Sequence, residues 1–486
     1  MNEEIRELEP KVLWNKFADL NAVPRPSKKE ERVIAFMKKF GEDLGLETVA
    51  DTVGNVIIKK PATPGMENRK KLVLQSHLDM VHQKNADTDF DFDNQGIEMY
   101  VDGDWVRAKG TTLGADNGLG VATIMAVLES DTIQHPAIEA LFTIDEETGM
   151  TGAMGLKGGL LEGDILLNLD TEEDDEIGVG CAGGIDITAT KTYKEEVAPV
   201  NTTAYTITVK GLNGGHSGMD IIKGLGNANV FMNRLLYKGY EKYGLRVASI
   251  QGGSLRNAIP RESFAIVVVE EASANTFELE LAEEIANIKA EYVNLEADLE
   301  IEITPTNLPE MVMEIGAQET AIKAIYAALN GVHRMSPEID GLVETSNNIA
   351  KVVVANGEAS VMCLTRSSVD SNKMDLANKL TSCFELGGFE VELSGAYPGW
   401  TPNMNSSIVK LTSELYKKIN GEEAHVAACH AGLECGILGT HYPEMEMVSF
   451  GPTIKGAHSP DERASISSAK KYWHFFLEVL KETPVK

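Results

Sequence analysis

The chain has 486 residues, with 74 acidic against 44 basic side chains and a formal net charge of −30. This length predicts two or three domains. The acidic balance argues against nucleic acid and anionic membrane surfaces as partners, because both attract basic proteins. No apolar run reaches the roughly 18 residues of a membrane-spanning helix. The N-terminus lacks a signal-peptide pattern, and the five scattered cysteines indicate reduced thiols in a cytoplasmic protein.

Residues 1–183 alternate helical and strand-like patterns. Helices are predicted over 3–19 and 28–45, and the apolar run 121–129 reads as a helix between two strands. Strands separated by helices predict an α/β domain with a mainly parallel sheet covered by helices. The strand-like runs are 55–60, 71–77, 139–145 and 164–170.

The pattern changes at residue 184, where long alternating runs begin. Two successive sets of strands and helices fill residues 184–400 and predict an inserted α+β domain, which we interpret as a doubled module. One irregular domain is the alternative. A proline-containing joint at 397–403 leads to residues 401–486, whose helix and strand patterns resemble the first segment. We therefore predict a catalytic domain in two parts, 1–183 and 401–486, interrupted by the insertion.

Metal-binding side chains follow the apolar runs of the predicted catalytic domain. Ligand-type residues at the carboxyl ends of strands are where an open α/β sheet places its active site. Two histidines and three carboxylates are a suitable donor set for a two-metal hydrolase. The five side chains are His77, Asp116, Glu147, Asp170 and His458.

Two further acids stand beside these residues. Asp79 lies two positions after His77, so both side chains point to one face of the strand, and the carboxylate can orient the imidazole. Glu146 adjoins Glu147, so one can bind metal while the other stays free as a general base. Each pattern alone has an ordinary alternative: a polar strand end, a surface turn or, for Asp116, a helix N-cap.

Five motifs in order, SHLDMV, LGADNG, DEETGMTGA, NLDTEE and GAHSPDER, resemble the zinc-dependent aminoacylase–carboxypeptidase–carnosinase superfamily of metallopeptidases. Within it, the chain is most similar to the bacterial aminoacyl-histidine dipeptidases, over almost its whole length. The resemblance implies a di-zinc enzyme that hydrolyses unblocked dipeptides, Xaa-His dipeptides included. N-acyl amino acid deacylation and tripeptide cleavage are alternatives within the superfamily, and a non-catalytic metal-binding scaffold is an alternative outside it.

The same resemblance implies a role for each candidate ligand. Asp116 would bridge two zinc ions and precede a cis peptide bond to Asn117. Glu146 would be the general base, and Asp79 would orient His77. Cobalt or manganese could replace zinc, because this donor set accepts all three. One ion would add His77 and Asp170, and the other Glu147 and His458.

The insertion would act as a lid that carries substrate-binding residues. His216 resembles a histidine that stabilises the oxyanion. Asn257 and Arg366 resemble residues that hold the substrate backbone or C-terminal carboxylate, which suits the planar fork of arginine. Gly432 aligns with a substrate-binding loop of the catalytic domain. Taken alone, a loop histidine is usually solvated and Arg366 would be an ordinary exposed charge.

The resemblance also implies a homodimer through the lid. The length of the insertion argues against this state, because a doubled lid can imitate a dimer partner within one chain. The implied partner is otherwise a small peptide substrate, with no nucleic acid and no membrane.

Overall fold

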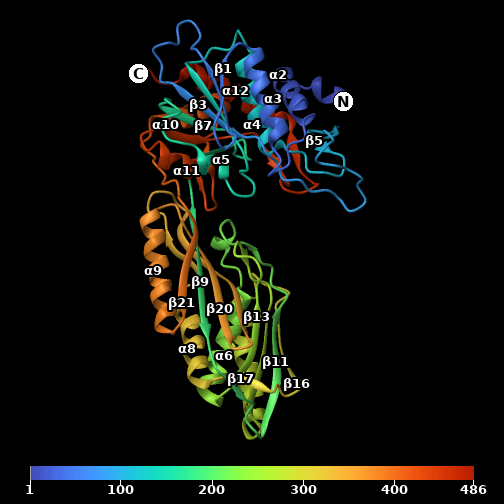
Figure 1. The fold of residues 1–486 in the computed structure, drawn as a ribbon, viewed down its shortest axis with the longest axis vertical. Coiled ribbons are helices and arrows are strands. Elements are labelled where there is room, and N and C mark those ends of the chain that lie inside the picture. The colour runs from blue at the N-terminus through green and yellow to red at the C-terminus, as the bar shows by residue number, and fades with distance from the viewer. Residues whose placement is uncertain (1) are drawn as a thin grey trace. The chain divides into compact units, whose positions relative to one another are not determined.

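In the computed structural model, which describes residues 2–486, the chain divides into two compact units (Figure 1). Unit 1 comprises Met1–Gly180, Trp400–Ala428 and Leu433–Lys486, and unit 2 comprises Cys181–Gly399 and Cys429–Gly432. The boundary predicted after residue 183 thus falls after residue 180, and the one predicted after 400 falls after 399.

The short segment Cys429–Gly432 departs from the predicted division, because it groups with unit 2 although 401–486 was expected to be catalytic domain. Hydrogen bonds explain this grouping. The N–H of Ala182 donates to the carbonyl oxygens of both Cys429 and Ala431, at 3.0 Å each. The His430 ring nitrogen Nε2 lies 2.8 Å from the Ser346 hydroxyl.

The main sheet of unit 1 has the strand order β1-β2-β6-β3-β7-β23-β8-β22. Its central strands β6, β3, β7 and β23 are parallel, while β1, β2 and β8 pair antiparallel. Every residue of β3, β6 and β7 is buried, as expected where both faces are covered. The predicted α/β class is confirmed, with parallel pairing confined to the centre. The strands are β1 Glu47–Ala50, β2 Val56–Lys60, β3 Leu72–His77, β6 Ile138–Thr143, β7 Ile165–Asn168, β8 Glu176–Cys181, β22 His425–Cys429 and β23 Glu446–Ser449.

The helices of unit 1 lie around this sheet, and a small sheet of β4, β5, β24 and β25 adjoins them. The expected helix over 3–19 is wrong as a single element, because it divides at Pro10 into α1 and α2. Proline lacks an N–H and its ring clashes with the preceding turn, so it is tolerated only where a helix begins. The remaining bounds are α1 Glu3–Arg6, α2 Lys11–Asn21, α3 Glu31–Asp43, α4 Ala115–Glu129, α5 Thr151–Gly155, α10 Ser407–Asn420, α11 Glu434–His441, α12 Ile466–Glu482, β4 Met99–Asp102, β5 Trp105–Ala108, β24 Ile454–Lys455 and β25 Arg463–Ser465.

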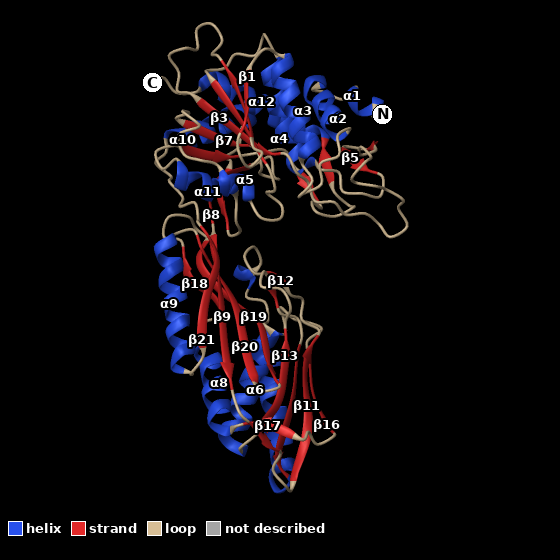
Figure 2. Ribbon diagram, in the orientation of Figure 1, coloured by secondary structure: helices blue, strands red, loops and turns tan. Residues whose placement is uncertain are grey.

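Unit 2 contains one nine-stranded antiparallel sheet, with the order β16-β11-β15-β13-β19-β20-β9-β21 and β18 paired to β19. Its apolar residues alternate along the strands and pack against helices in one core. Figure 2 shows α8 and α9 along one side of the sheet. The elements are β9 Gly183–Thr192, β11 Thr202–Lys210, α6 Ala228–Tyr243, β13 Arg246–Gly252, β15 Ser263–Glu270, α7 Ala274–Tyr292, β16 Glu300–Thr306, α8 Ile315–Ala327, β18 Gly331–Met335, β19 Val343–Ala355, β20 Glu358–Ser367, α9 Asp370–Leu386 and β21 Glu390–Tyr397.

The topology of unit 2 contains the expected doubling. One βαββαβ module is β11-α6-β13-β15-α7-β16, with the strand order β16-β11-β15-β13. The other is β9-α8-β19-β20-α9-β21, with the equivalent order β21-β9-β20-β19. The modules join edge to edge through β13 and β19. The sequence predicted two successive modules. In the structure they are not successive, because the first module is inserted between β9 and α8 of the second.

Two general features of the chain bear on the expectations from composition. Among residues 2–486, no helix combines the length and apolar character needed to cross a bilayer. No disulfide joins the five cysteines.

Glu446, the first residue of β23, fastens this strand to α10. Its carboxylate accepts hydrogen bonds from the Ser407 N–H at 2.6 Å and from the hydroxyls of Ser406 and Ser407, and Lys70 lies 3.1 Å away. Burial raises the pKa of Glu446, but these hydrogen bonds outweigh it and lower the pKa from 4.5 to about 2. The folded state therefore favours the ionised carboxylate.

We expect Glu446→Gln to lower the free energy of unfolding by about 1–3 kcal/mol at neutral pH, because charged hydrogen bonds are lost. A depressed folded-state pKa contributes stability above the unfolded-state pKa and loses it as the pH falls. The difference in free energy of unfolding between wild type and Glu446→Gln should therefore become smaller as the pH falls from 4.5 to about 2. Urea unfolding at several pH values measures it, and a difference independent of pH would contradict the assignment.

Candidate metal centre and catalytic residues

The carboxyl ends of the parallel strands bring the predicted ligands to one edge of the unit 1 sheet. His77 is the last residue of β3, and Asp170 follows β7 by two residues. Glu146 and Glu147 follow β6. Asp116 lies in the first turn of α4, where its backbone and that of Asn117 are not helical, and the peptide bond between them is cis, as the resemblance predicts.

Asp116 lies between His77 and His458 and faces each histidine with a different oxygen. Its Oδ1 is 3.2 Å from His77 Nε2, and its Oδ2 is 3.2 Å from His458 Nε2. His77 Nε2 is also 3.6 Å from Asp170 Oδ1, and His458 Nε2 is 3.0 Å from Glu147 Oε2. The structure thus places the five side chains in two groups that share one carboxylate.

Asp79 connects the His77 ring to the loop that carries the two glutamates. The His77 Nδ1 lies 3.3 Å from Asp79 Oδ1 and 3.1 Å from the Asp79 carbonyl oxygen. The same carboxylate accepts the backbone N–H groups of Glu146 and Glu147, at 3.0 and 3.3 Å, and the Ser27 hydroxyl at 2.8 Å. This arrangement directs the His77 Nδ1 proton toward Asp79 and leaves Nε2 facing Asp116 and Asp170.

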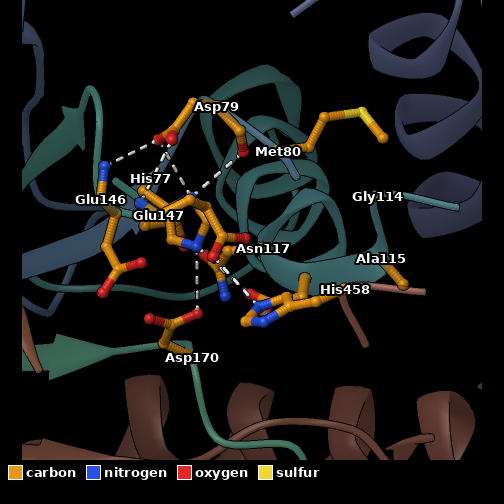
Figure 3. A network of polar contacts seen from close by, with 12 residues as sticks. His77, Asp79, Met80, Gly114, Ala115, Asn117, Glu146, Glu147, Asp170 and His458 are labelled. Atoms are coloured by element: carbon orange, nitrogen blue, oxygen red, sulfur yellow. Dashed lines mark hydrogen bonds and ion pairs between the residues drawn. The ribbon is translucent and has the colours of Figure 1, made fainter. Parts of the chain in front are cut away.

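The carboxylate of Glu146 takes no part in the hydrogen bonds and ion pairs drawn in Figure 3, where only its backbone N–H is engaged. One of its oxygens lies within 4.8 Å of donor atoms of His77 and Glu147. Burial raises the pKa of Glu146 well above its ordinary value. The charge of His77 lowers this pKa, and the charge of Asp170 raises it further. A sixth carboxyl-bearing or imidazole side chain, Glu146, thus lies next to the five candidate ligands.

The side chains of this cluster shift one another's pKa values. Hydrogen bonds to Asp116 and Glu147 raise the pKa of His458 to about 11. Burial would lower the pKa of His77, but Asp170 and Asp116 raise it well above its usual range. Burial likewise raises the pKa of Asp170 well above its usual range. The acids and imidazoles of this cluster, of which His77 is buried and His458 exposed, thus hold protons in the absence of another cation.

The donor set fits divalent metal ions. Glu147 Oε1 and Asp170 Oδ1 are buried and have no hydrogen-bond partner among the described residues. Such atoms are costly to bury unless a donor or a cation satisfies them. Two imidazoles with three carboxylates suit zinc, cobalt or manganese.

A chain of buried polar side chains crosses the four parallel strands one layer below the ligands. Ser449 donates to Asn168 at 2.5 Å, Asn168 to Gln75 at 2.6 Å, and Gln75 to Glu434 at 2.7 Å. Thr143 also donates to Glu434, at 2.6 Å. None of these residues was predicted from the sequence. Gln75 and Asn168 carried a signal, because each is a polar residue in an apolar strand two positions before a candidate ligand, His77 and Asp170.

Two further residues that were not predicted from the sequence, Arg25 and Glu462, contact the loop that carries Asp116. Glu462 lies within the motif GAHSPDER, so its proximity to His458 was visible, but no pattern indicated its partner. Arg25 stands in the segment VPRPS, which carries no recognisable signal.

The residues expected in the lid meet within unit 2. His216 pairs with Ala258 in a two-residue ladder, and the Asn257 carbonyl oxygen accepts the Ser217 N–H at 2.8 Å. His216 Nε2 lies 3.5 Å from the Arg366 guanidinium. Gly432 belongs to the segment Cys429–Gly432 of unit 2.

His216 and Arg366 form a pair of donors. The His216 Nδ1 accepts backbone N–H groups of Gly218 and Met219, at 3.3 and 3.1 Å, so the ring proton lies on Nε2. Burial and the charge of Arg366 lower the pKa of His216, which keeps the ring neutral. Arg366 is 4% exposed, and its hydrogen bond to Tyr397 measures 2.9 Å. Among the described residues it has no carboxylate partner, so the pair can bind an anion.

Comparison with known proteins gives consistent matches. The model of "Peptidase family M20/M25/M40" matches residues 73–482. The cytosol non-specific dipeptidase of Escherichia coli (strain K12) is 43% identical over 483 residues, covering 99% of this chain and 100% of the relative. The structure of an aminoacylhistidine dipeptidase from Vibrio alginolyticus has a TM-score of 0.95 and 45% identity, covering 100% of this chain and 99% of that one. A tripeptidase from Staphylococcus aureus, at 17% identity and a TM-score of 0.56, shares the fold.

We expect Zn²⁺ added to chelator-treated protein to raise its melting temperature. A ligand that binds only the folded state stabilises it by about 2.7 kcal/mol at 100 times its Kd. The effect should shrink as the pH is lowered, because His77 and His458 hold protons that the metal must displace. Thermal unfolding at several pH values measures it, and Mg²⁺, which disfavours imidazole ligands, is the matched control. Equal stabilisation by both ions would contradict this description of the site.

Proposed function

Because this chain belongs to peptidase family M20/M25/M40, as its five motifs predict, we propose that it is a di-metal dipeptidase. Its substrates would be unblocked dipeptides, Xaa-His dipeptides included. The observation that carries the proposal is the pair of ligand groups sharing Asp116 with the unengaged Glu146 beside them. The dipeptidase names of the Escherichia coli and Vibrio alginolyticus relatives support it.

In this proposal the two groups would hold two zinc ions. His77 and Asp170 would be ligands in one group, Glu147 and His458 in the other, and Asp116 in both. When bound, such ions lower the pKa of water and polarise the scissile carbonyl. Asp79 orients His77 and fixes the backbone of the two glutamates, so one carboxylate controls a ligand and the base together.

Glu146 is assigned as the general base. Its carboxylate accepts a proton from water as the oxygen adds to the carbonyl carbon. It then delivers that proton to the leaving nitrogen as the C–N bond breaks, giving a free amine and a free carboxylate. The half-buried setting of Glu146 suits both steps, because a raised pKa favours return of the proton. No covalent enzyme intermediate is involved.

The donors of unit 2 are assigned to the substrate. His216, with its proton on Nε2, would stabilise the developing oxyanion, and Arg366 would pair with the C-terminal carboxylate. Asn257 and Gly432 are proposed to contact the substrate backbone. Recognition of both the free amine and the free carboxylate would restrict the enzyme to short peptides.

A cytoplasmic location agrees with the word "cytosol" in the name of the Escherichia coli relative and with five cysteines that form no disulfide. The homodimer through the lid stays a prediction. Sedimentation of dilute protein tests it.

The proposal is tested by hydrolysis of alanyl-histidine with wild type and Glu146→Gln. We expect the variant to retain about two metals per chain and to lose roughly 10²–10⁴-fold in kcat, as expected for loss of a general base. Elemental analysis of the same samples measures the metal.

Glu446→Gln is the matched control, because it makes the same chemical change at the amino end of β23 and should keep wild-type kcat. A Glu146→Gln enzyme with undiminished kcat would contradict the general-base assignment. If the wild-type protein binds metal but cleaves no dipeptide, this would instead indicate a deacylase or a non-catalytic metal-binding protein.

Substrate length provides a further prediction. We expect alanyl-histidine to be cleaved with much higher kcat/KM than N-acetyl-alanyl-histidine or alanyl-alanyl-histidine. For Arg366→Lys, KM should rise more than kcat falls, because lysine keeps the charge but loses the planar fork. Tripeptide cleaved as fast as dipeptide would instead identify a tripeptidase, and preference for the acetylated substrate a deacylase.

A further inference from the structure

The loop that carries Asp116 is held by two buried charged side chains, Glu462 and Arg25. They are 2% and 1% exposed. None of the metal-ligand assignments above uses either residue. Charged groups are almost never fully buried unless they are satisfied by partners, so their partners indicate what they do.

Glu462 accepts four consecutive backbone N–H groups. Its Oε2 accepts those of Leu113 and Gly114, at 2.7 and 2.9 Å. Its Oε1 accepts those of Ala115 and Asp116, at 2.8 and 3.2 Å. These are the N–H groups at the start of α4, which have no acceptor within the helix. One carboxylate therefore fixes the backbone up to and including Asp116.

Arg25 binds carbonyl oxygens of the two ligand loops. Its guanidinium donates to Gly114 at 2.5 Å and to Leu78 and Asp79 at 3.1 Å each. Gly114 precedes Asp116, and Leu78 follows His77. Arg25 therefore connects the loop of Asp116 to the end of β3.

The glycines of the loop are adapted to Arg25. A Cβ atom at Gly114 or at Gly118 would lie 2.6 Å from an Arg25 guanidinium nitrogen, closer than such contacts allow. Gly114 also has φ +69°, which other residues rarely adopt. The pattern GADNG thus leaves room for the arginine as well as for the turn.

Glu462 also belongs to the turn that carries His458. The Glu462 N–H donates to the Ser459 carbonyl oxygen at 3.0 Å, and the Ser459 hydroxyl donates to the Gly456 carbonyl oxygen at 2.7 Å. His458 has φ 64°, a conformation that persists only where the surroundings fix it. A displacement of Glu462 would therefore move the His458 turn relative to Asp116.

We propose that Glu462, supported by Arg25, is a positioning residue of the metal centre. Its carboxylate joins the turn of His458 to the loop of Asp116 and sets the orientation in which the two Asp116 oxygens face the two histidines. This inference rests on the proposed function only in taking Asp116 and His458 as metal ligands.

A residue that stabilises the fold alone would lower the free energy of unfolding and leave metal affinity unchanged. A positioning residue changes metal affinity by itself. Substitutions behind metal ligands typically cost roughly 10–100-fold in affinity. Metal affinity and stability measured on the same variants therefore separate the two roles.

The test is a Zn²⁺ titration of chelator-treated full-length protein in competition with a chromophoric chelator. In Glu462→Gln the amide NH₂ group faces two backbone N–H donors, so two of the four hydrogen bonds are lost. We expect at least one Zn²⁺ dissociation constant to rise roughly 10–100-fold. The absorption spectrum of the Co²⁺-loaded variant should also change.

Glu446→Gln is the matched control, because it too removes the charge of a carboxylate with four donors in unit 1. It should lower stability and keep both Zn²⁺ dissociation constants. Wild-type constants in Glu462→Gln would overturn the proposal, as would equal weakening in both variants.

Glu462→Asp keeps the negative charge but shortens the side chain by one methylene. It is also the variant to measure if Glu462→Gln does not fold. Weakened Zn²⁺ binding in Glu462→Asp supports positioning, whereas wild-type binding shows that position is not what matters and overturns it. The proposed function fails separately, if wild type binds Zn²⁺ but does not hydrolyse alanyl-histidine. The titrations remain interpretable in that case.

Discussion

The sharing of Asp116 between His77 and His458 is the contact on which the rest of unit 1 depends. Two histidines can face the two oxygens of one carboxylate only if three segments distant in sequence meet: the end of β3, the start of α4 and the turn that carries His458. The buried parallel strands β6, β3 and β7 fix the position of the first of these segments. The loop at the start of α4 separately sets the orientation of the Asp116 carboxylate.

The same contact explains why so many polar groups are buried around it. Carboxylates that converge without water repel one another, so each must be oriented by its own partners until a cation joins them. Asp79, with its two oxygens directed at His77 and at the backbone of Glu146 and Glu147, does this for three residues. One layer deeper, the hydrogen-bonded side chains from Ser449 to Glu434 orient one another and connect neighbouring strands.

The sequence predicted the elements of the sheet well, and the five candidate ligands it indicated lie close together in the structure, because both depend on local patterns. A buried strand is a short apolar run, and a ligand at its end is visible as a change from apolar to polar, as at His77 and Asp170. It could not predict Glu462 or Arg25 in their roles, because these side chains bind backbone N–H and carbonyl groups. Backbone groups leave no mark in the sequence, so such partners become visible only in three dimensions.

Chain order in unit 2 has a consequence for folding. β9 ends at Thr192, but its neighbours β20 and β21 begin only at Glu358 and Glu390. During synthesis the module of β11 to β16 can close while β9 still lacks both partners. Pairing across so long a separation is entropically slow, and an unpaired strand is prone to associate with other chains. β9 therefore lacks both partners during much of synthesis. Its C-terminal half, Thr188–Thr192, has three threonines and one lysine rather than a continuous apolar run, which limits the risk of such association.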